Sequence, residues 1–296
     1  MGLSKQQKQT KNYFEKVSNQ WHIKANLHSD KILNIIDQRN NYVKKIALNF
    51  LDKKNRILDV GCGTGELVVD LLKTGYDAYG IDFSNSMIKK AREHAAKNHV
   101  SDKVFIKESF FTHTFSEKFD LISANGFIEY ISERELSEFF KKSYLLLSKN
   151  GILVVGSRNR LFNVFSFNKY TMDEMKAGNL DALVEECIYF NSEKNLNLEF
   201  NEVKSKIKTN LKKHSKTGIN VDTRFQYTPF QIFEKLKKSG FRAFDLSPIH
   251  IHIFCTGTKK IHSDFHNVVS NHMQNQINNK GLIPQSSSFM ISAKRM

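Results

Sequence analysis

The chain has 296 residues, of which 40% are hydrophobic, so it is long enough to bury the core of one large α/β domain with an insertion. It has no apolar run long enough to span a membrane, no signal-peptide pattern and no paired cysteines, which favours a cytoplasmic protein without disulfide bridges or a zinc site. The net charge of +15, from 45 Lys and Arg against 30 Asp and Glu, favours polyanionic partners, although Lys is frequent throughout and only residues 203–216 form a basic cluster.

The first fifty residues predict helices that precede a sheet. Residues 1–11 are polar and are expected to be loose. Over residues 13–49, apolar side chains recur at helical spacing, beginning with Tyr13, Phe14 and Trp21. We expect these helices to cover one side of the sheet.

A short strand, a glycine turn and a helix follow. Ile57–Val60 predicts a buried strand, and the apolar pattern of a helix runs over residues 66–74. Between them lies Gly61-Cys62-Gly63-Thr64-Gly65, with glycines at alternate positions. Glycine has no Cβ and tolerates positive φ, so such a turn lets a ligand lie against the main chain beside the free N–H groups of a helix start. The spacing fits neither the dinucleotide fingerprint nor the P-loop.

Two acidic residues accompany this turn. Asp59 lies two positions before the first glycine, where it suits a ligand that carries an amino group and a positive charge. Asp82 ends the next apolar strand, where a carboxylate can accept hydrogen bonds from both hydroxyls of a ribose. Together they favour a positively charged nucleoside over a pyrophosphate.

Strands and helices then alternate without a gap up to residue 155. Strands are expected at 78–82, 103–107, 119–125 and 152–155, and helices at 84–95 and 133–147. Ser84 is the expected N-cap of the first of these helices. The alternation predicts a parallel sheet with right-handed crossovers, whose ligand lies at the carboxyl ends of the strands.

Four segments in order, Leu58–Glu66, Gly80–Ser84, Phe119–Tyr130 and Leu147–Val155, resemble the motifs of the class I (Rossmann-like) S-adenosylmethionine-dependent methyltransferases, over about half of the chain. The resemblance implies an α/β fold with a seven-stranded, mostly parallel sheet, helices on both faces, an antiparallel last strand and a helical cap inserted after strand five. It implies S-adenosyl-L-methionine as cofactor and S-adenosyl-L-homocysteine as product. Residues 1–50 then correspond to the N-terminal lid of many members, or to helices that only pack on the core.

The resemblance also assigns roles to single residues. The loop around the methionine part of the cofactor is assigned to Asp59, Gly61, Cys62, Gly63 and Gly65. The ribose contact is assigned to Asp82, the adenine flanks to Phe83 and Met87, the adenine edge to Ser109 and Phe110, and the central contact to Asn125 and Gly126. Glu129 and Tyr130 follow in a segment that faces the methyl group in the family. Either is expected to act as general base or substrate anchor, the alternative being a solvated helix start and a packing residue.

The alternation breaks after strand five. We divide the chain into a core of residues 51–157 and 226–296 and an inserted substrate cap of residues 158–225, with helical stretches around 172–190 and 198–211. In the cap, Arg158 and Arg160 could hold a phosphate or carboxylate as paired donors, with Tyr170 beside them, or could be surface arginines.

The remainder returns to the sheet. A helix is expected from Thr228-Pro229 to Ser239, a sixth strand from Phe241, a helix around 268–277 within a polar loop of residues 256–284, and an antiparallel seventh strand over 288–293. His250 and His252 alternate onto one face, as a base or anchor for the site or as structural residues. His262, His266 and His272 share no ligand spacing, so no metal is predicted.

The sequence therefore predicts an S-adenosylmethionine-dependent methyltransferase that acts on an oxygen or nitrogen of a small molecule, such as a sugar, a glycolipid or a secondary metabolite. The cap and its arginines favour an acceptor that is partly anionic. Two alternatives stay open: an RNA methyltransferase that uses the basic cluster, and a methyltransferase of quinone or lipid precursors. We expect a monomer or a homodimer.

Overall fold

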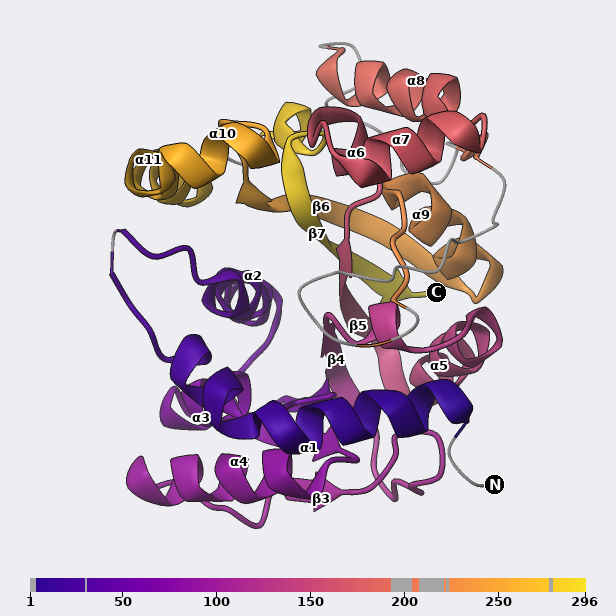
Figure 1. Cartoon of the computed structure of the whole chain (residues 1–296). Helices are drawn as coiled ribbons and strands as arrows, with labels where there is room; N and C mark the ends of the chain where they lie inside the picture. The colour runs from indigo at the N-terminus through magenta and orange to yellow at the C-terminus, as the bar shows by residue number, and fades with distance from the viewer. Residues whose placement is uncertain (1–3, 30, 193–203, 208–220, 222–223, 277–278) are drawn as a thin grey trace.

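The computed structural model describes residues 4–29, 31–192, 204–207, 221, 224–276 and 279–296. Its centre is a seven-stranded sheet in the order β3-β2-β1-β4-β5-β7-β6 (Figure 1). The strands are β1 Arg56–Val60, β2 Asp77–Asp82, β3 Phe105–Lys107, β4 Phe119–Asn125, β5 Leu147–Arg158, β6 Phe241–Ile251 and β7 Ser286–Arg295. The first five strands pair in parallel, and β7 lies antiparallel between β5 and β6. The predicted mostly parallel sheet with an antiparallel last strand is confirmed.

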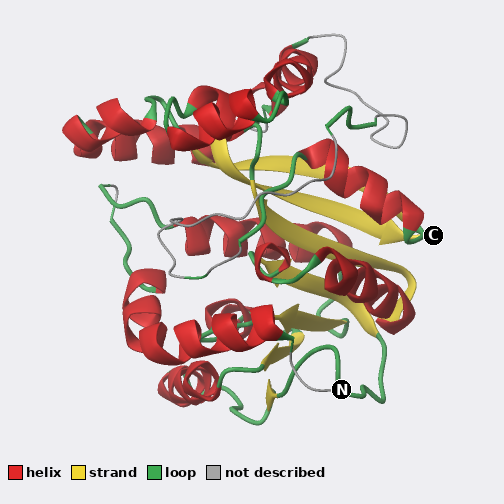
Figure 2. Cartoon of the chain, turned by 45° about the vertical axis from the view of Figure 1, so that its right-hand side comes forward, coloured by secondary structure: helices red, strands yellow, loops and turns green. Residues whose placement is uncertain are grey.

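Helices cover both faces of the sheet, as Figure 2 shows. The longer helices are α1 Lys5–Ala25, α2 Ile35–Phe50, α3 Glu66–Lys73, α4 Asn85–Lys97, α5 Glu133–Leu146, α8 Leu180–Asn191, α9 Pro229–Lys238 and α11 Ser263–Gln276. On one face α2, α3 and α4 bury an apolar cluster that includes Val43, Val68 and Ala91. On the other face α5 and α9 bury a cluster that includes Phe139 and Phe233. Removing this apolar surface from water is the main driving force for the fold.

The predicted helix starts carry the expected caps. The Ser84 hydroxyl accepts a hydrogen bond from the Met87 N–H at the start of α4. Thr228 and Gln231 form a reciprocal capping box at the start of α9, with Pro229 in the first turn. These local signals made both helix starts predictable from the sequence.

Three expected boundaries are wrong. Residues 5–11 are helical and not loose, because Ser4 caps the start of α1 and accepts from the Gln7 N–H. Strand β3 begins at Phe105 and not at residue 103, because a turn joins the Phe105 N–H to the Asp102 carbonyl. In the C-terminal loop, α10 (Thr256–Ile261) and α11 already begin before residue 268.

The insertion after β5 contains three helices in the part that the structure describes. These are α6 (Phe162–Phe165), α7 (Lys169–Lys176) and α8, and α7 and α8 are separated at Gly178, whose φ is +67°. They stack beyond the ends of β6 and β7, next to the 3-10 helix η3 (Lys280–Leu282) (Figure 1). The helix expected over 198–211 and the basic cluster 203–216 lie mostly outside the described residues.

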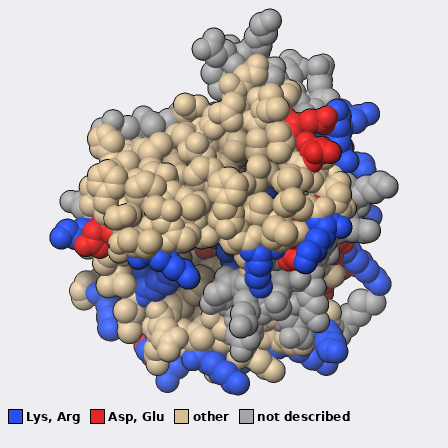
Figure 3. Space-filling view, turned by 45° about the horizontal axis from the view of Figure 1, so that its top comes forward, with Lys and Arg blue, Asp and Glu red and all other residues tan. Residues whose placement is uncertain are grey.

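Two surface properties bear on the class of protein. No helix among the described residues is both long and apolar enough to cross a membrane. On the face drawn in Figure 3, Lys and Arg side chains lie in several groups.

Candidate functional site

A pocket of about 440 Å³ lies at the carboxyl ends of β1, β2 and β4. Helices α1 and α2 form its other wall, and the loop before α9 closes one end through Arg224. In open α/β sheets ligands bind at this edge, because a crevice forms at the carboxyl ends of the strands where the strand order reverses. We therefore expect the predicted cofactor and acceptor residues to line this pocket.

The glycine turn adopts the backbone conformation that its sequence predicts. Gly61, Gly63 and Gly65 have φ values of +71°, +54° and +83°. A Cβ at Gly61 would lie 3.0 Å from the Phe127 ring. Gly61 and Gly63 line the pocket, so main-chain atoms are open to a ligand there. Gly65 does not line it: a Cβ there would meet the Phe105 ring at 2.8 Å, so this glycine serves the close approach of α3 to β3.

Asp59 and Asp82 form no ion pair with a cation in the described part of the chain. The Asp59 Oδ1 accepts from the Ser123 hydroxyl at 2.6 Å, and Asp82 accepts from the Ser84 N–H at 2.8 Å and the Gly63 N–H at 3.2 Å. Burial raises the pKa of Asp59 to about 7 and that of Asp82 to about 6. A ligand with an ammonium group and two hydroxyls would compensate both carboxylates, so the site fits the predicted cofactor.

The other predicted cofactor residues converge on the same pocket. Those that line it are Cys62, Phe83, Met87, Ser109, Phe110, Asn125 and Gly126. Glu108 lines it as well, next to Ser109. The sequence thus located one wall of the pocket almost completely.

Helix α1 lies alongside α4 and forms the outer wall of the pocket through Tyr13, Phe14 and Trp21 (Figure 1). Its attachment is polar. The Glu15 carboxylate accepts from the Asn85 and Ser86 N–H groups at 2.6 and 2.9 Å, where α4 begins. A carboxylate at a helix start is stabilised by the unpaired N–H groups there.

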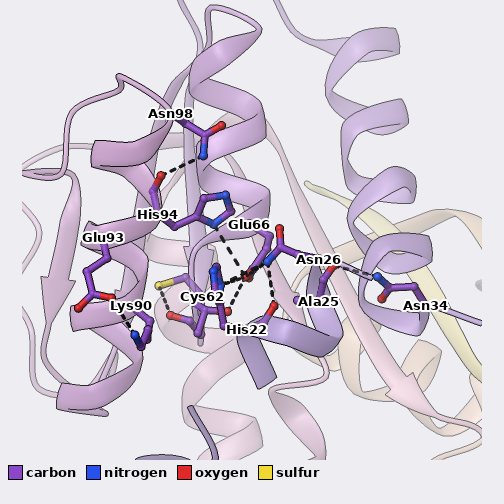
Figure 4. A network of polar contacts seen from close by, with 12 residues as sticks. His22, Ala25, Asn26, Asn34, Cys62, Glu66, Lys90, Glu93, His94 and Asn98 are labelled. Atoms are coloured by element: carbon purple, nitrogen blue, oxygen red, sulfur yellow. Dashed lines mark hydrogen bonds and ion pairs between the residues drawn. The ribbon is translucent and has the colours of Figure 1, made fainter. Parts of the chain in front are cut away.

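A second attachment joins the other end of α1 to α3, as Figure 4 shows. The Glu66 Oε1 accepts from the Asn26 amide at 3.2 Å and lies 3.0 Å from the His22 Nδ1. The same oxygen accepts from the Thr64 hydroxyl at 2.6 Å. Because Glu66 directly follows the glycine turn, these bonds tie the position of α1 to the turn.

Beyond the glycine turn, the pocket ends in a group of arginines around one carboxylate. Glu129 is fully buried, with Oε1 3.1 Å from the Arg39 Nη2 and Oε2 2.7 Å from the Arg224 Nε. Burial raises the pKa of Glu129, but Arg224 and Arg39 outweigh that effect and leave it below its usual value. Glu129 does not line the pocket. The structure therefore gives it the role of holding two arginines and not that of a free general base.

Tyr130 lines the pocket and faces α1. Its ring lies edge-on to Phe14, with centroids 5.4 Å apart, and the Arg224 guanidinium carbon lies 5.1 Å from the ring centroid. Its hydroxyl has no hydrogen-bond partner among the described residues. Burial raises the pKa of Tyr130 far above its usual value, so the phenol stays protonated and offers a hydrogen bond to a ligand.

Of the three arginines that line the pocket, Arg158 is the one that forms no ion pair with a carboxylate in the described part of the chain, and Glu129 acts on it only through space. Arg158 lines the large pocket and also a smaller cavity of about 160 Å³ between α6, α7 and α10. Its Nε has no hydrogen-bond partner in that part. Burial and the neighbouring Arg224 lower the pKa of Arg158 to about 10, so it remains charged at neutral pH. Tyr170, the third predicted substrate residue, lines the smaller cavity.

Besides Gly65, Glu129 and Tyr170, two further predicted site residues, Arg160 and His250, do not line the large pocket. Arg160 donates to both oxygens of Glu174 at 2.8 Å, is 2% exposed, and so braces the insertion internally. His250 has its Nδ1 2.8 Å from the Ser287 hydroxyl and its Nε2 3.0 Å from the Lys259 Nζ. Burial lowers the pKa of His250 well below its usual value. The structure thus corrects the expected acceptor role of Arg160 and the expected basic role of His250.

Arg39 and Arg224 line the pocket and were missed by sequence reasoning. Arg39 comes from α2, and a Cβ at Gly126 would lie 2.3 Å from its Nη1, so this glycine makes room for the guanidinium. Its one sequence signal is a charged residue inside the apolar pattern of α2. Arg224 lies in the insertion, where no local pattern identified it.

Comparison with known proteins agrees with this geometry. The family model described as a methyltransferase domain matches residues 51–217, more than half of the chain. Over 146 residues the chain is 32% identical to the ubiquinone biosynthesis O-methyltransferase of Pelagibacter ubique, which covers 48% of this chain and 59% of that protein. The enzyme of the same name from Bradyrhizobium diazoefficiens is 32% identical over 113 residues, or 38% of this chain and 43% of that one. The chain thus spans about half the length of these relatives.

Among solved structures, the chain resembles magnesium protoporphyrin IX methyltransferase from Synechocystis PCC 6803 with bound S-adenosylhomocysteine. The TM-score is 0.56 at 13% identity, with 97% of this chain and 98% of that chain covered. At this level of identity the likeness shows the fold alone. It covers the whole sheet, including the two strands that follow the insertion.

Proposed function

The chain belongs to the family of class I S-adenosylmethionine-dependent methyltransferases, and we propose that its acceptor is a small molecule with an anionic group close to the oxygen or nitrogen that is methylated. The observation that carries this proposal is the guanidinium of Arg158 at the far end of the pocket, which forms no ion pair in the described part of the chain. The site geometry supports the anionic group, and the relatives' names support a phenolic acceptor as a second candidate.

The glycine-turn side of the pocket would hold the cofactor. S-adenosylmethionine supplies a methyl group on a positively charged sulfur, which is reactive without activation by the protein. Asp59 would hold its amino group, Asp82 its ribose hydroxyls, and Phe83 and Met87 would flank its adenine. The chain's task is then to hold the acceptor in line and to keep water out.

The arginine side of the pocket would hold the acceptor. Among the described residues at this end of the pocket, Arg39, Arg158 and Arg224 lie around one carboxylate, that of Glu129. A buried excess of positive charge is costly without an anion, and guanidinium groups bind carboxylates and phosphates through paired hydrogen bonds. A carboxylate or phosphate on the acceptor would therefore be stabilised next to Arg158.

The acceptor's own proton needs no protein base in this arrangement. Glu129 is occupied by two guanidinium groups, and His250 lies outside the pocket lining. Nearby positive charge lowers the pKa of a hydroxyl, so Arg158 and Arg224 favour the ionised form of an acidic hydroxyl. Tyr130 would orient the acceptor through its unpartnered phenol.

A phenolic precursor of a quinone is the second candidate. The names of the two relatives support it, and so do the aromatic rings of Phe14, Phe111 and Phe127 in the pocket lining. A phenol with a carboxylate would satisfy both the arginines and the aromatic wall. An RNA acceptor has less support, because α1 covers the pocket.

The test is methyl transfer to fractionated host extract. We would incubate the protein with methyl-labelled S-adenosylmethionine and extract divided into RNA, protein, lipid and small-molecule pools, with Asp82→Ala as a control that removes the proposed ribose contact. Label in the small-molecule or lipid pool that is lost in Asp82→Ala supports the proposal. Label confined to RNA or protein would contradict it.

A further inference from the structure

Three histidines that do not line the large pocket meet in the interior between β6 and α11. His250 lies at the end of β6, His252 directly follows this strand, and His266 comes from α11. They are 8%, 4% and 0% exposed. One ring nitrogen of each lies within 4.8 Å of the others. In the sequence His266 stands near His262 and His272, with which it shares no ligand spacing, whereas the fold places it beside His250 and His252.

The ring nitrogens of two of these residues lack partners. Neither nitrogen of His252 or His266 has a hydrogen-bond partner in the described residues. A neutral imidazole carries one donor and one acceptor, and buried polar atoms of native proteins are almost always paired. Such a group of unpaired, buried nitrogens needs a ligand that accepts their lone pairs.

We propose that His250, His252 and His266 bind one divalent transition-metal ion, of which zinc is the reference case. Neutral imidazole is a preferred ligand of zinc, copper and nickel, and three histidines with one water molecule complete a tetrahedral shell. This site is independent of the proposed methyl acceptor. Nothing in the proposed transfer uses it.

The surroundings of His250 suit a ligand. Its Nδ1 lies 2.8 Å from the Ser287 hydroxyl, which can accept the ring proton there and leave the Nε2 lone pair free for a metal. That Nε2 lies 3.0 Å from the Lys259 Nζ. The lysine ammonium group therefore lies on the side of His250 where a metal ion bound to Nε2 would lie. Lys259 from α10 and Arg158 from β5 are the positive charges that act on the cluster. A metal ion would displace the Lys259 ammonium.

The consequence would be structural. The α11 helix already bonds to β6 through the Gln274 amide, which donates to the Pro248 carbonyl at 2.8 Å, and through the Ser270 hydroxyl, which donates to the Ile251 carbonyl. A metal held by ligands from both elements would fasten α11 to the sheet. Metal binding should therefore raise the unfolding temperature of the chain.

The experiment is a zinc titration of the full chain after removal of metal with EDTA, followed by calorimetry. We expect one equivalent to bind, and His252→Ala and His266→Ala each to weaken binding by at least about tenfold. His272→Ala is the matched control, because His272 is exposed on the same helix. Lys259→Met should tighten binding by about tenfold, because the competing charge is removed.

Three results would overturn the proposal. One is no zinc binding by the wild-type chain. Another is binding that survives His266→Ala but is lost in His94→Ala, which would place the ion in the other histidine group, His22, Glu66 and His94. S-adenosylhomocysteine binding shows whether each variant is folded. The third result applies if the variants do not fold, and it comes from X-ray absorption of the zinc-loaded wild type. A sulfur ligand would contradict the site, whereas nitrogen ligands at about 2.0–2.1 Å without sulfur would support it.

Discussion

Replacing Glu129 by Gln should destabilise the protein severely. The carboxylate is fully buried and lies 3.1 Å from the Arg39 Nη2 and 2.7 Å from the Arg224 Nε, so the variant removes the negative charge that pairs with the partly buried Arg39 and the buried Arg224. Breaking a buried ion pair from one side costs about 3–5 kcal/mol, because the remaining charge stays desolvated. Urea unfolding followed by circular dichroism measures this loss at pH 7.

Glu133→Gln is the matched control, four residues further on. Its exposed pair with Lys235 at 3.1 Å should be worth less than about 1 kcal/mol. Because the arginines hold the pKa of Glu129 below 4.5, its contribution is complete above pH 4.5 and is lost as the pH falls through the lowered pKa. Equal losses of unfolding free energy in the two variants would refute the reasoning.

Three further substitutions test the site. Gly61→Ala should weaken S-adenosylhomocysteine binding in calorimetry by at least about tenfold, because the new Cβ would clash with Phe127 and the backbone there is left-handed. Gly178→Ala is the control: its φ is also positive, at +67°, but the space around it is open, so binding should be unchanged. Asp59→Asn should remove a pH dependence of ligand-free stability: with the native pKa near 7 against 3.8 unfolded, the contribution of Asp59 is complete below pH 3.8 and is lost as the pH rises towards 7. Unfolding curves from pH 4 to 8 measure this, and an unchanged profile would contradict it. Arg160→Met should lower the unfolding free energy by about 3–5 kcal/mol, because the buried Glu174 carboxylate loses its cationic partner. The folded fraction of this variant should transfer the methyl group at the wild-type rate.

The cofactor half of the site was predictable because its signals are local. A strand, three alternate glycines and a helix start lie within ten residues, and each glycine has the positive φ that its position requires. Asp82 was found in the same way, at the end of the next strand. Caps at Ser84 and Thr228 are also set by neighbouring residues, so those helix starts were predicted correctly.

The end of the pocket that we propose for the acceptor depends on contacts between distant parts of the chain. Arg39 and Arg224 reach Glu129 across 90 and 95 residues, and no local pattern specifies such a meeting. Arg158 and Arg160 look alike in sequence, but only Arg158 lines the pocket, because Glu174 binds Arg160 inside the insertion. The charge that we propose to select the acceptor was therefore visible only in the fold.

The most direct test of the proposed acceptor is the charge of the labelled product. Wild type, Arg158→Met and the exposed control Arg134→Met would each be incubated with methyl-labelled S-adenosylmethionine and the small-molecule and lipid pools, and the product would be separated by anion exchange. We predict a product that the anion exchanger retains, with transfer reduced by at least about tenfold in Arg158→Met and unchanged in Arg134→Met. A neutral product formed equally well by all three proteins would contradict the proposal.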